Sequence, residues 1–165
     1  MVPIFATLDF LASGSYQRRV GNSVHPCMSQ TSISRSIRST IDAIQQIMHR
    51  WIKFPSTRDE MEIVRNRFQE TYGFPGVVGV VDGTHICITP PNSDIEETYF
   101  NRKGFHSLNA MIVSYADNKI LAVNARYGGR ANDARVYNNS ILSAFMNQKY
   151  AEGLRRFWLI VSKIV

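Results

Sequence analysis

Cysteine is scarce in this sequence of 165 residues, which contains only Cys27 and Cys87. The two residues lie far apart, so they form neither a metal-binding pair of short spacing nor the framework of a disulfide-rich domain. Disulfides are typical of secreted proteins, whereas cytosolic and nuclear proteins keep their thiols reduced. We therefore expect a protein of a reducing intracellular compartment.

Long apolar runs are also missing. No stretch of about 18 consecutive apolar residues occurs, which argues against a helix that spans a membrane. The first residues carry no positive charge before their apolar part, unlike a secretory signal peptide. The nucleophile-elbow pattern Gly-x-Ser-x-Gly is absent as well, so nothing indicates a hydrolase with a Ser-His-Asp triad.

Acidic residues are fewer than basic ones, with 13 Asp and Glu against 19 Lys and Arg and a net charge of +6. A basic balance favours polyanionic partners, because Lys and Arg displace counterions from phosphate groups. Charge alone does not decide the matter, since many basic proteins never bind nucleic acid. The 44% of hydrophobic residues and the length suit one globular domain, or one domain with a small appendage.

The region 1–54 has a helical period. Its apolar residues recur every three or four positions and predict one apolar stripe on a long helix; they are Ile33, Ile37, Ile41, Ile44, Met48 and Trp51. Gly21 and Asn22 predict a turn before it, and Arg35 and Arg38 would point outward. This is the outline of a helix-turn-helix. A plain amphipathic helix with a solvated basic face fits the same pattern, and the pattern alone favours it.

A second helix is predicted in the linking region 55–75. Thr57 and Glu60 have the spacing of a capping box, and Gly73 with Pro75 would end the helix. Its apolar face would consist of Met61, Val64 and Phe68. The remaining region, 76–165, has a different period.

The region 76–165 predicts an α/β fold. Residues 77–81 are β-branched and suit a buried strand that continues to Thr89, and residues 108–115 and 120–127 form a strand hairpin. A helix would begin at Asp133 and a last strand would cover 157–161. The inner side of that helix would carry Val136, Ile141, Leu142 and Phe145. The order indicates an incomplete RNase H-like mixed sheet with flanking helices, preceded by the helical region.

Two carboxylates stand out in this region. Asp82 ends the buried strand, a place where α/β folds often present site residues, and Asp133 follows two glycines. Hard cations such as Mg²⁺ require oxygen ligands of this kind. A turn at Gly83 for Asp82 and a helix N-cap for Asp133 are the structural alternatives. His85 would point to the opposite face of the strand from Asp82, so a purely structural role fits it at least as well as a ligand role.

Basic residues accompany the aromatic ones. Arg102 and Lys103 lie between Tyr99-Phe100 and Phe105, an arrangement that can stack bases and contact phosphates. Arg126 and Arg130 flank the glycines before Asp133 and would bring positive charge towards the acids. For Arg102 and Lys103, a solvated loop without a binding role explains the pattern equally well.

Taken together, these segments resemble the PIF/Harbinger transposase superfamily, and in particular the Harbinger transposase-derived nucleases. The matching segments are Val81 to Ile86, Pro90-Pro91, Asn101 to Asn109 and Gly128 to Val136, with Phe10 to Tyr16 and Trp51 to Pro55 upstream. The resemblance implies an RNase H-like DDE nuclease that hydrolyses DNA with a divalent metal cation, Mg²⁺ or Mn²⁺, and that follows a helix-turn-helix-like region. It also implies location in the nucleus, with the cytoplasm as an alternative, and a Myb/SANT-like DNA-binding partner protein, without a membrane role.

By position, Asp82 matches the family's first metal-binding Asp and Asp133 matches the Asp of its Gly-Ser-x-His-Asp-Ser motif. Both are thereby implied as catalytic residues and metal ligands. The motif here reads Gly-Arg-Ala-Asn-Asp-Ala, with Arg130, Asn132 and Ala134 in place of Ser, His and Ser. These replacements change the hydrogen bonding expected around Asp133.

The last residues depart further from the family. There, a strand like 157–160 leads into another metal-binding Asp, and a closing Glu lies on a later helix. Here Val161 to Val165 follow instead, so we expect a chain that is truncated at its C-terminus and does not cleave DNA by itself. A non-catalytic DNA- or protein-binding module that keeps the fold is the alternative, and an unstable fragment is a third reading.

Overall fold

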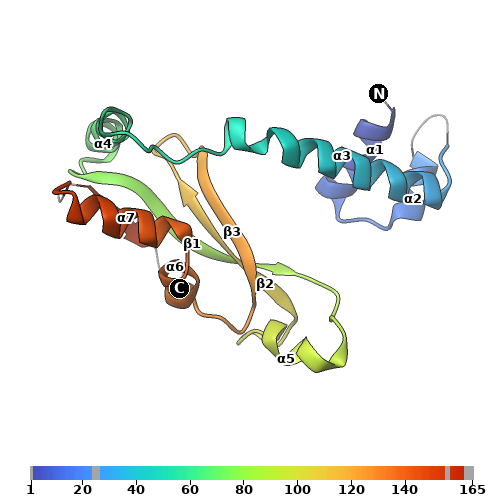
Figure 1. Ribbon diagram of the computed structural model, residues 1–165. Coiled ribbons are helices and arrows are strands. Elements are labelled where there is room, and N and C mark those ends of the chain that lie inside the picture. Colours follow the sequence, from blue (N-terminus) through green and yellow to red (C-terminus); the bar gives the residue numbers. More distant parts are fainter. Residues whose placement is uncertain (1, 24–26, 155–156, 162–165) are drawn as a thin grey trace. The chain divides into compact units, whose positions relative to one another are not determined.

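The structure, a computed structural model, describes residues 2–23, 27–154 and 157–161. The chain forms two compact units, Met1–Trp51 and Ile52–Val165, and Figure 1 shows the elements of each. Over the described ranges, no helix combines the length and the apolar character needed to cross a membrane.

The first unit consists of three helices: α1 (Val2–Ser13), α2 (Gln17–Ser23) and α3 (Gln30–Trp51). Their buried core contains Ala6, Val20, Ile33 and Ile37, to which each helix contributes. Ser29 caps α3, because its Oγ accepts a hydrogen bond of 3.2 Å from the backbone N–H of Ser32. The predicted helical region is confirmed.

One detail of the prediction for this unit is wrong, and the structure adds another that the sequence pattern left open. Gly21 lies inside α2, where it is buried, and not in a turn. The stripe on α3 is buried only at Ile33 and Ile37, while Ile44, Met48 and Trp51 are exposed, Trp51 by 80%. The period of a helix predicts which residues share a face, but the core formed with α1 and α2 ends near Ile41.

The second unit contains a four-stranded sheet of order β3-β2-β1-β4. Its strands are β1 (Val77–Cys87), β2 (Ser107–Ser114), β3 (Ile120–Gly128) and β4 (Trp158–Val161). The pairs β1–β2 and β2–β3 are antiparallel, whereas β4 runs parallel to β1. This mixed sheet agrees with the predicted partial RNase H-like fold. Strand β1 ends at Cys87, somewhat before the predicted Thr89.

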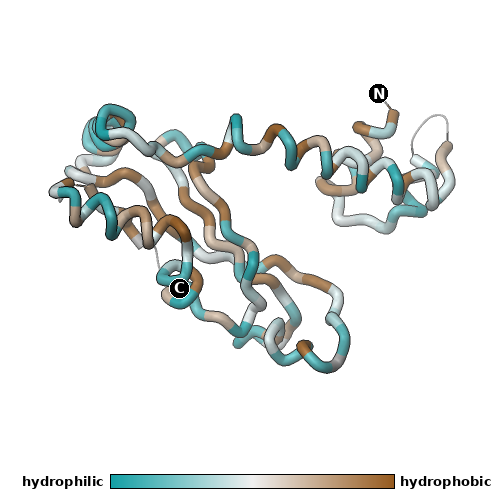
Figure 2. Tube along the Cα trace, in the orientation of Figure 1, coloured by the Kyte–Doolittle hydropathy of each residue, from teal (hydrophilic) through white to brown (hydrophobic). Residues whose placement is uncertain are grey.

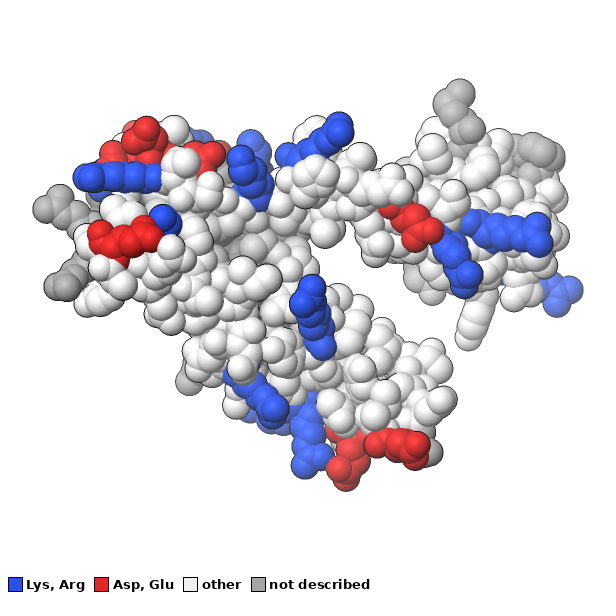
Figure 3. Space-filling model, in the orientation of Figure 1, with Lys and Arg blue, Asp and Glu red and all other residues white. Residues whose placement is uncertain are grey.

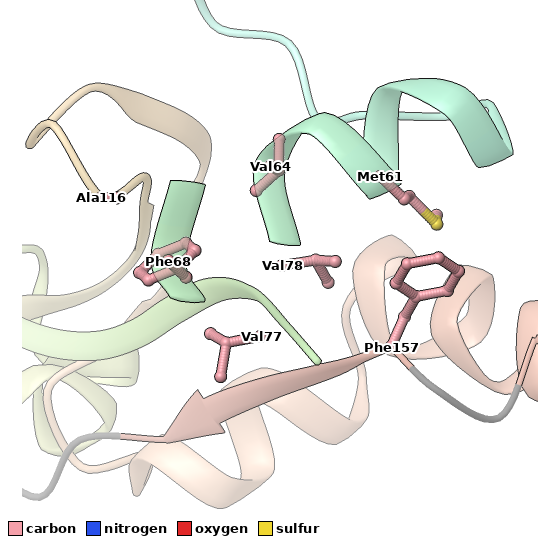
Figure 4. Packing of buried hydrophobic residues seen from close by; sticks show 7 residues of the cluster. All are labelled: Met61, Val64, Phe68, Val77, Val78, Ala116 and Phe157. Atoms are coloured by element: carbon pink, nitrogen blue, oxygen red, sulfur yellow. The ribbon is translucent and has the colours of Figure 1, made fainter. Parts of the chain in front are cut away.

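Helix α4 (Arg58–Tyr72) packs against β1. Its first turn has the predicted capping box between Thr57 and Glu60, and Gly73 ends it with a φ of 71°. Figure 4 shows its buried side chains against the start of the sheet. The cluster consists of Met61, Val64, Phe68, Val77, Val78, Ala116 and Phe157. Since α4 packs so closely on β1, it lies in the same compact unit as the sheet; the three-part division at residues 54 and 75 stays a prediction.

The segment after β3 forms two helices where one was predicted, α6 (Asp133–Asn138) and α7 (Ile141–Ala151), because Ser140 caps a new start. Val136 and Leu142 are buried against the sheet residues Val81, Met111 and Val113. Ile141, in contrast, is 84% exposed, so its predicted inward position is wrong. In Figure 2 the hydrophobic colours are frequent along the strands, while most of the α4 trace has hydrophilic colours.

Between β1 and β2 the chain forms a short 3-10 turn (Ser93–Ile95) and helix α5 (Glu96–Tyr99). An isolated bridge between Phe100 and His106 closes the following loop. This loop carries Arg102 and Lys103, two of the predicted basic residues.

Candidate metal and nucleic-acid site

Asp82 lies on β1, one residue beyond the last described pair with β4, which is Val81 with Val161. It faces Ile112 across the antiparallel pair with β2. Its side chain is half-buried, and its Oδ1 accepts a hydrogen bond of 2.9 Å from the backbone N–H of Gly83. Both residues are inside the strand, so the alternative of a turn at Gly83 is wrong.

Asp133 is the first residue of α6, and its carboxylate lies against the backbone of Gly83. A Cβ built on Gly83 would come within 2.6 Å of Asp133 Cγ, so a side chain at position 83 would displace the carboxylate. The N-cap of α6 is Asn132, whose side chain accepts a 2.8 Å hydrogen bond from Arg135 N–H. The alternative role of Asp133 as the N-cap is therefore wrong, and its carboxylate is directed to β1 instead.

The two carboxylates reach β1 from its two faces. Gly83 shares the face of Val81, which packs under α6 and α7, and Asp82 points to the other face because side chains alternate along a strand. Asp82 and Gly83 are nevertheless neighbours, so both carboxylates meet the strand at the same point. A cation in contact with both Asp82 and Asp133 would have to lie at the edge of β1, beyond the pair at Val81.

The carboxylates fit a hard divalent cation as two ligands and not as a complete set. One oxygen of each is held by the protein, Asp82 Oδ1 by Gly83 N–H and Asp133 Oδ1 by the side chain of Asn109. No described residue donates to the Oδ2 atom of either, which leaves one hard oxygen on each for a cation. A group of three or more His, Cys, Asp or Glu side chains placed for a metal does not occur within residues 2–23, 27–154 and 157–161.

Asn109, on β2, is a site residue that the sequence analysis missed. It is 1% exposed, and its Nδ2 donates 2.8 Å hydrogen bonds to Asp133 Oδ1 and to the carbonyl oxygen of Ala131. The available signal was an amide within the otherwise apolar run Leu-Asn-Ala-Met-Ile-Val, because a buried polar residue is more informative than an exposed one.

His85 takes part in a different hydrogen-bond network. Its Nδ1 lies 3.0 Å from the Oγ of buried Ser107, which also accepts a 2.8 Å hydrogen bond from Asn101 Nδ2. Asn101 Oδ1 in turn accepts hydrogen bonds from the backbone of Lys103 and Phe105. The contacts support the structural role of His85 and show that this network orders the loop from Asn101 to Gly104.

The predicted nucleic-acid-binding residues of the second unit are all exposed. Arg102 and Lys103 stand on the ordered loop, and Arg126 lies on β3. Arg130 forms a 2.9 Å ion pair with Glu97 of α5, which offsets its charge. On the visible face in Figure 3, some Lys and Arg side chains adjoin one another in the lower part of the view beside acidic side chains, and others stand apart.

In the first unit, Arg35 and Arg38 are exposed on α3, one helical turn apart. They line an open depression that also includes Asp42. A second depression, of about 860 Å³, is lined by Tyr16, Arg18 and Arg19 together with other polar residues. The sequence analysis missed this second basic position, although the adjacent arginines were visible in the sequence.

The comparisons with known proteins agree with this architecture. Residues 81–159, from the middle of β1 into β4, match the family model described as DDE superfamily endonuclease. The chain is 34% identical over 141 residues to the Homo sapiens protein named "Putative nuclease HARBI1". The aligned region covers 86% of this chain and 40% of that protein. The Xenopus laevis protein of the same name is 32% identical over 158 residues, 95% of this chain and 44% of that protein.

A more distant match is the Arabidopsis thaliana protein named antagonist of like heterochromatin protein 1, with 28% identity over 98 residues, 59% of this chain and 24% of that protein. No solved structure matches the chain. The chain spans less than half the length of the curated relatives that it matches. The chain is similar to the Harbinger transposase-derived nucleases, and its residues 81–159 match the DDE superfamily endonuclease model.

Proposed function

We propose that the second unit is part of a divalent-metal-dependent DNA nuclease, in which Asp82 and Asp133 are the first two acidic ligands. The observation that carries the proposal is the position of the Asp133 carboxylate on Gly83, the residue next to Asp82. When bound, Mg²⁺ or Mn²⁺ would activate the attacking oxygen and stabilise the leaving oxygen of a phosphodiester. The two aspartates would hold the cation through the oxygens that no described residue occupies.

DNA is the proposed partner of both units. Arg35 and Arg38 on α3 would contact the phosphate backbone, as would Arg102, Lys103 and Arg126 in the second unit. Arg130 would contribute once its ion pair with Glu97 opens. A nuclear location, with the cytoplasm as the alternative, and a Myb/SANT-like DNA-binding partner protein belong to the same proposal, because they follow from the family resemblance.

For these 165 residues alone, we propose DNA binding without cleavage. Two carboxylates rarely provide enough ligands for the two cations of such nucleases, and the described residues provide no group of three. This observation favours a DNA- or protein-binding module as the second candidate function. Cleavage by a longer protein of this family would then need additional ligands.

Labelled duplex DNA, incubated with the purified chain and Mg²⁺ or Mn²⁺, tests both candidates. We expect a mobility shift that weakens with added salt, no cleavage, and weaker binding by the Arg35→Ala/Arg38→Ala variant, whose salt dependence should fall by roughly one unit for each lost phosphate contact. The matched control is Arg67→Ala, because Arg67 is already paired with Asp117 at 2.9 Å. Metal-dependent cleavage that Asp82→Asn abolishes would contradict the binding-only proposal, and the absence of a shift at low salt would contradict the DNA partner.

A further inference from the structure

Asn109 occupies a position that packing alone does not explain. Its side chain is almost completely buried on β2, and its Oδ1 is buried without a hydrogen-bond partner among the described residues. An unpaired buried amide oxygen is unfavourable, and an apolar side chain of similar volume would avoid that cost. The benefit of an amide at this position must therefore come from its Nδ2.

The Nδ2 group donates to two acceptors on either side of Asn132, the N-cap of α6. One is the Ala131 carbonyl oxygen and the other is Asp133 Oδ1, each at 2.8 Å. A single amide group thus holds both the backbone that leads into α6 and the carboxylate of its first residue. Without this contact, the exposed Asp133 side chain would be free to exchange between rotamers.

The sheet register explains how this contact directs Asp133 to β1. Asn109 pairs with His85 and Met111 pairs with Gly83, so Asn109 lies diagonally across from Gly83 on the same face of the sheet. The carboxylate lies between the donor on β2 and the backbone of Gly83 on β1, where the missing Cβ leaves room for it.

We propose that Asn109 is a positioning residue that holds the Asp133 carboxylate on β1, beside Asp82, with Oδ2 left for a divalent cation. The inference rests on the proposed function, because it assumes that Asp133 binds metal. Residues that hydrogen-bond a metal ligand typically change metal affinity roughly 10–100-fold when they are replaced.

The first test is a calorimetric titration of the full 165-residue chain with Mn²⁺ alone. We expect Asn109→Ala to weaken Mn²⁺ binding roughly tenfold, and to have no further effect in an Asp133→Ala background, since the two residues act through one contact. Gly83→Ala should weaken binding as well, because its Cβ displaces the carboxylate from the other side. It provides a second perturbation if Asn109→Ala does not fold.

Asn101→Ala is the matched control. Asn101 is also buried and also donates through Nδ2, but its acceptor is Ser107 and not Asp133. We expect it to lower the melting temperature and to leave Mn²⁺ affinity unchanged. Wild-type affinity in both folded Asn109→Ala and Gly83→Ala, with loss in Asp133→Ala, would overturn the positioning role. An equal effect of Asn109→Ala with and without Asp133 would overturn it too.

The second test does not depend on metal. The side-chain amide resonances of Asn109 in a ¹H–¹⁵N spectrum should shift on Asp133→Ala, whereas those of Asn101 should not. Unchanged Asn109 resonances would overturn the proposal. An Asn109 shift in a chain that binds no Mn²⁺, or binds it equally well after Asp133→Ala, would support the contact and contradict the assignment of Asp133 as a metal ligand.

Discussion

Asn132 illustrates how one residue determines what its neighbour can do. It stands where the related motif has His, and its side chain accepts the hydrogen bond from Arg135 N–H that starts α6. Asp133 would serve equally well as a cap by residue type, but it is one position too late in the chain. Its carboxylate is therefore available to Asn109 and β1.

Replacement of Asn132 should show this capping role. We expect Asn132→Ala to lower the free energy of unfolding by about 1 kcal/mol, because the first turn of α6 loses a side-chain acceptor. Asn132→Ser should retain most of the stability, since Ser also caps helices well. Urea denaturation measures both, with Asn138→Ala, on the exposed side of the same helix, as the control. Equal losses in Asn132→Ala and Asn138→Ala would contradict the assignment.

At the scale of elements, the start of α4 is stabilised by the negative charge of the Glu60 side chain. The Glu60 carboxylate accepts hydrogen bonds from the backbone N–H groups of Ser56 and Thr57, at 2.8 and 3.1 Å. These bonds, the one from Ser56 first, lower the pKa of Glu60 from 4.5 to about 2, and the charge of Lys53 adds to the effect. The folded state therefore favours the ionised carboxylate more than the unfolded chain does.

A pH dependence follows from the depressed pKa. The stabilisation by ionised Glu60 is fully present above about pH 4.5 and is lost as the pH falls towards 2, because protons then bind the unfolded chain more readily. We expect the melting temperature of Glu60→Gln to fall less steeply than that of the wild type across this range. Glu62→Gln is the control, since Glu62 forms an ion pair with the exposed Arg58 and does not cap the helix. Parallel curves for the wild type and Glu60→Gln would contradict the expectation.

At the scale of the whole molecule, the chain has two compact units with separate buried cores. The core of the first unit contains Ile33, and that of the second contains Met61, each fully buried. Because a cooperative unit is held together by its own buried contacts, we expect local opening in one unit to leave the other folded.

Hydrogen exchange measured by mass spectrometry can test this independence. Ile33→Ala should destabilise the first unit by about 2–5 kcal/mol and reduce protection in α1 to α3, without a change in β1 and β2. Met61→Ala should show the reverse pattern, with the loss confined to the second unit. A loss of protection in both units from either substitution would show that they unfold together.

Local sequence patterns were sufficient for much of the fold. The capping box at Thr57 and Glu60, the apolar face of α4, the strands and the hairpin between β2 and β3 all follow rules that act over a few residues. The same rules placed Asp82 at the end of the buried strand, whereas it lies inside β1. They could not predict that the buried stripe of α3 ends near Ile41, because burial depends on which other elements pack there.

The sequence by itself thus determined the four strands in their order and the helices α3 and α4, and it selected Asp82 and Asp133 as candidate site residues. The tertiary structure decided that Asp133 reaches β1 at Gly83, that Asn109 holds it there, and that Asp82 approaches from the opposite face. These relations join residues from three elements that are far apart along the chain. They depend on strand register and on how closely the Asp133 side chain approaches the backbone of Gly83. Local periodicity specifies neither of these.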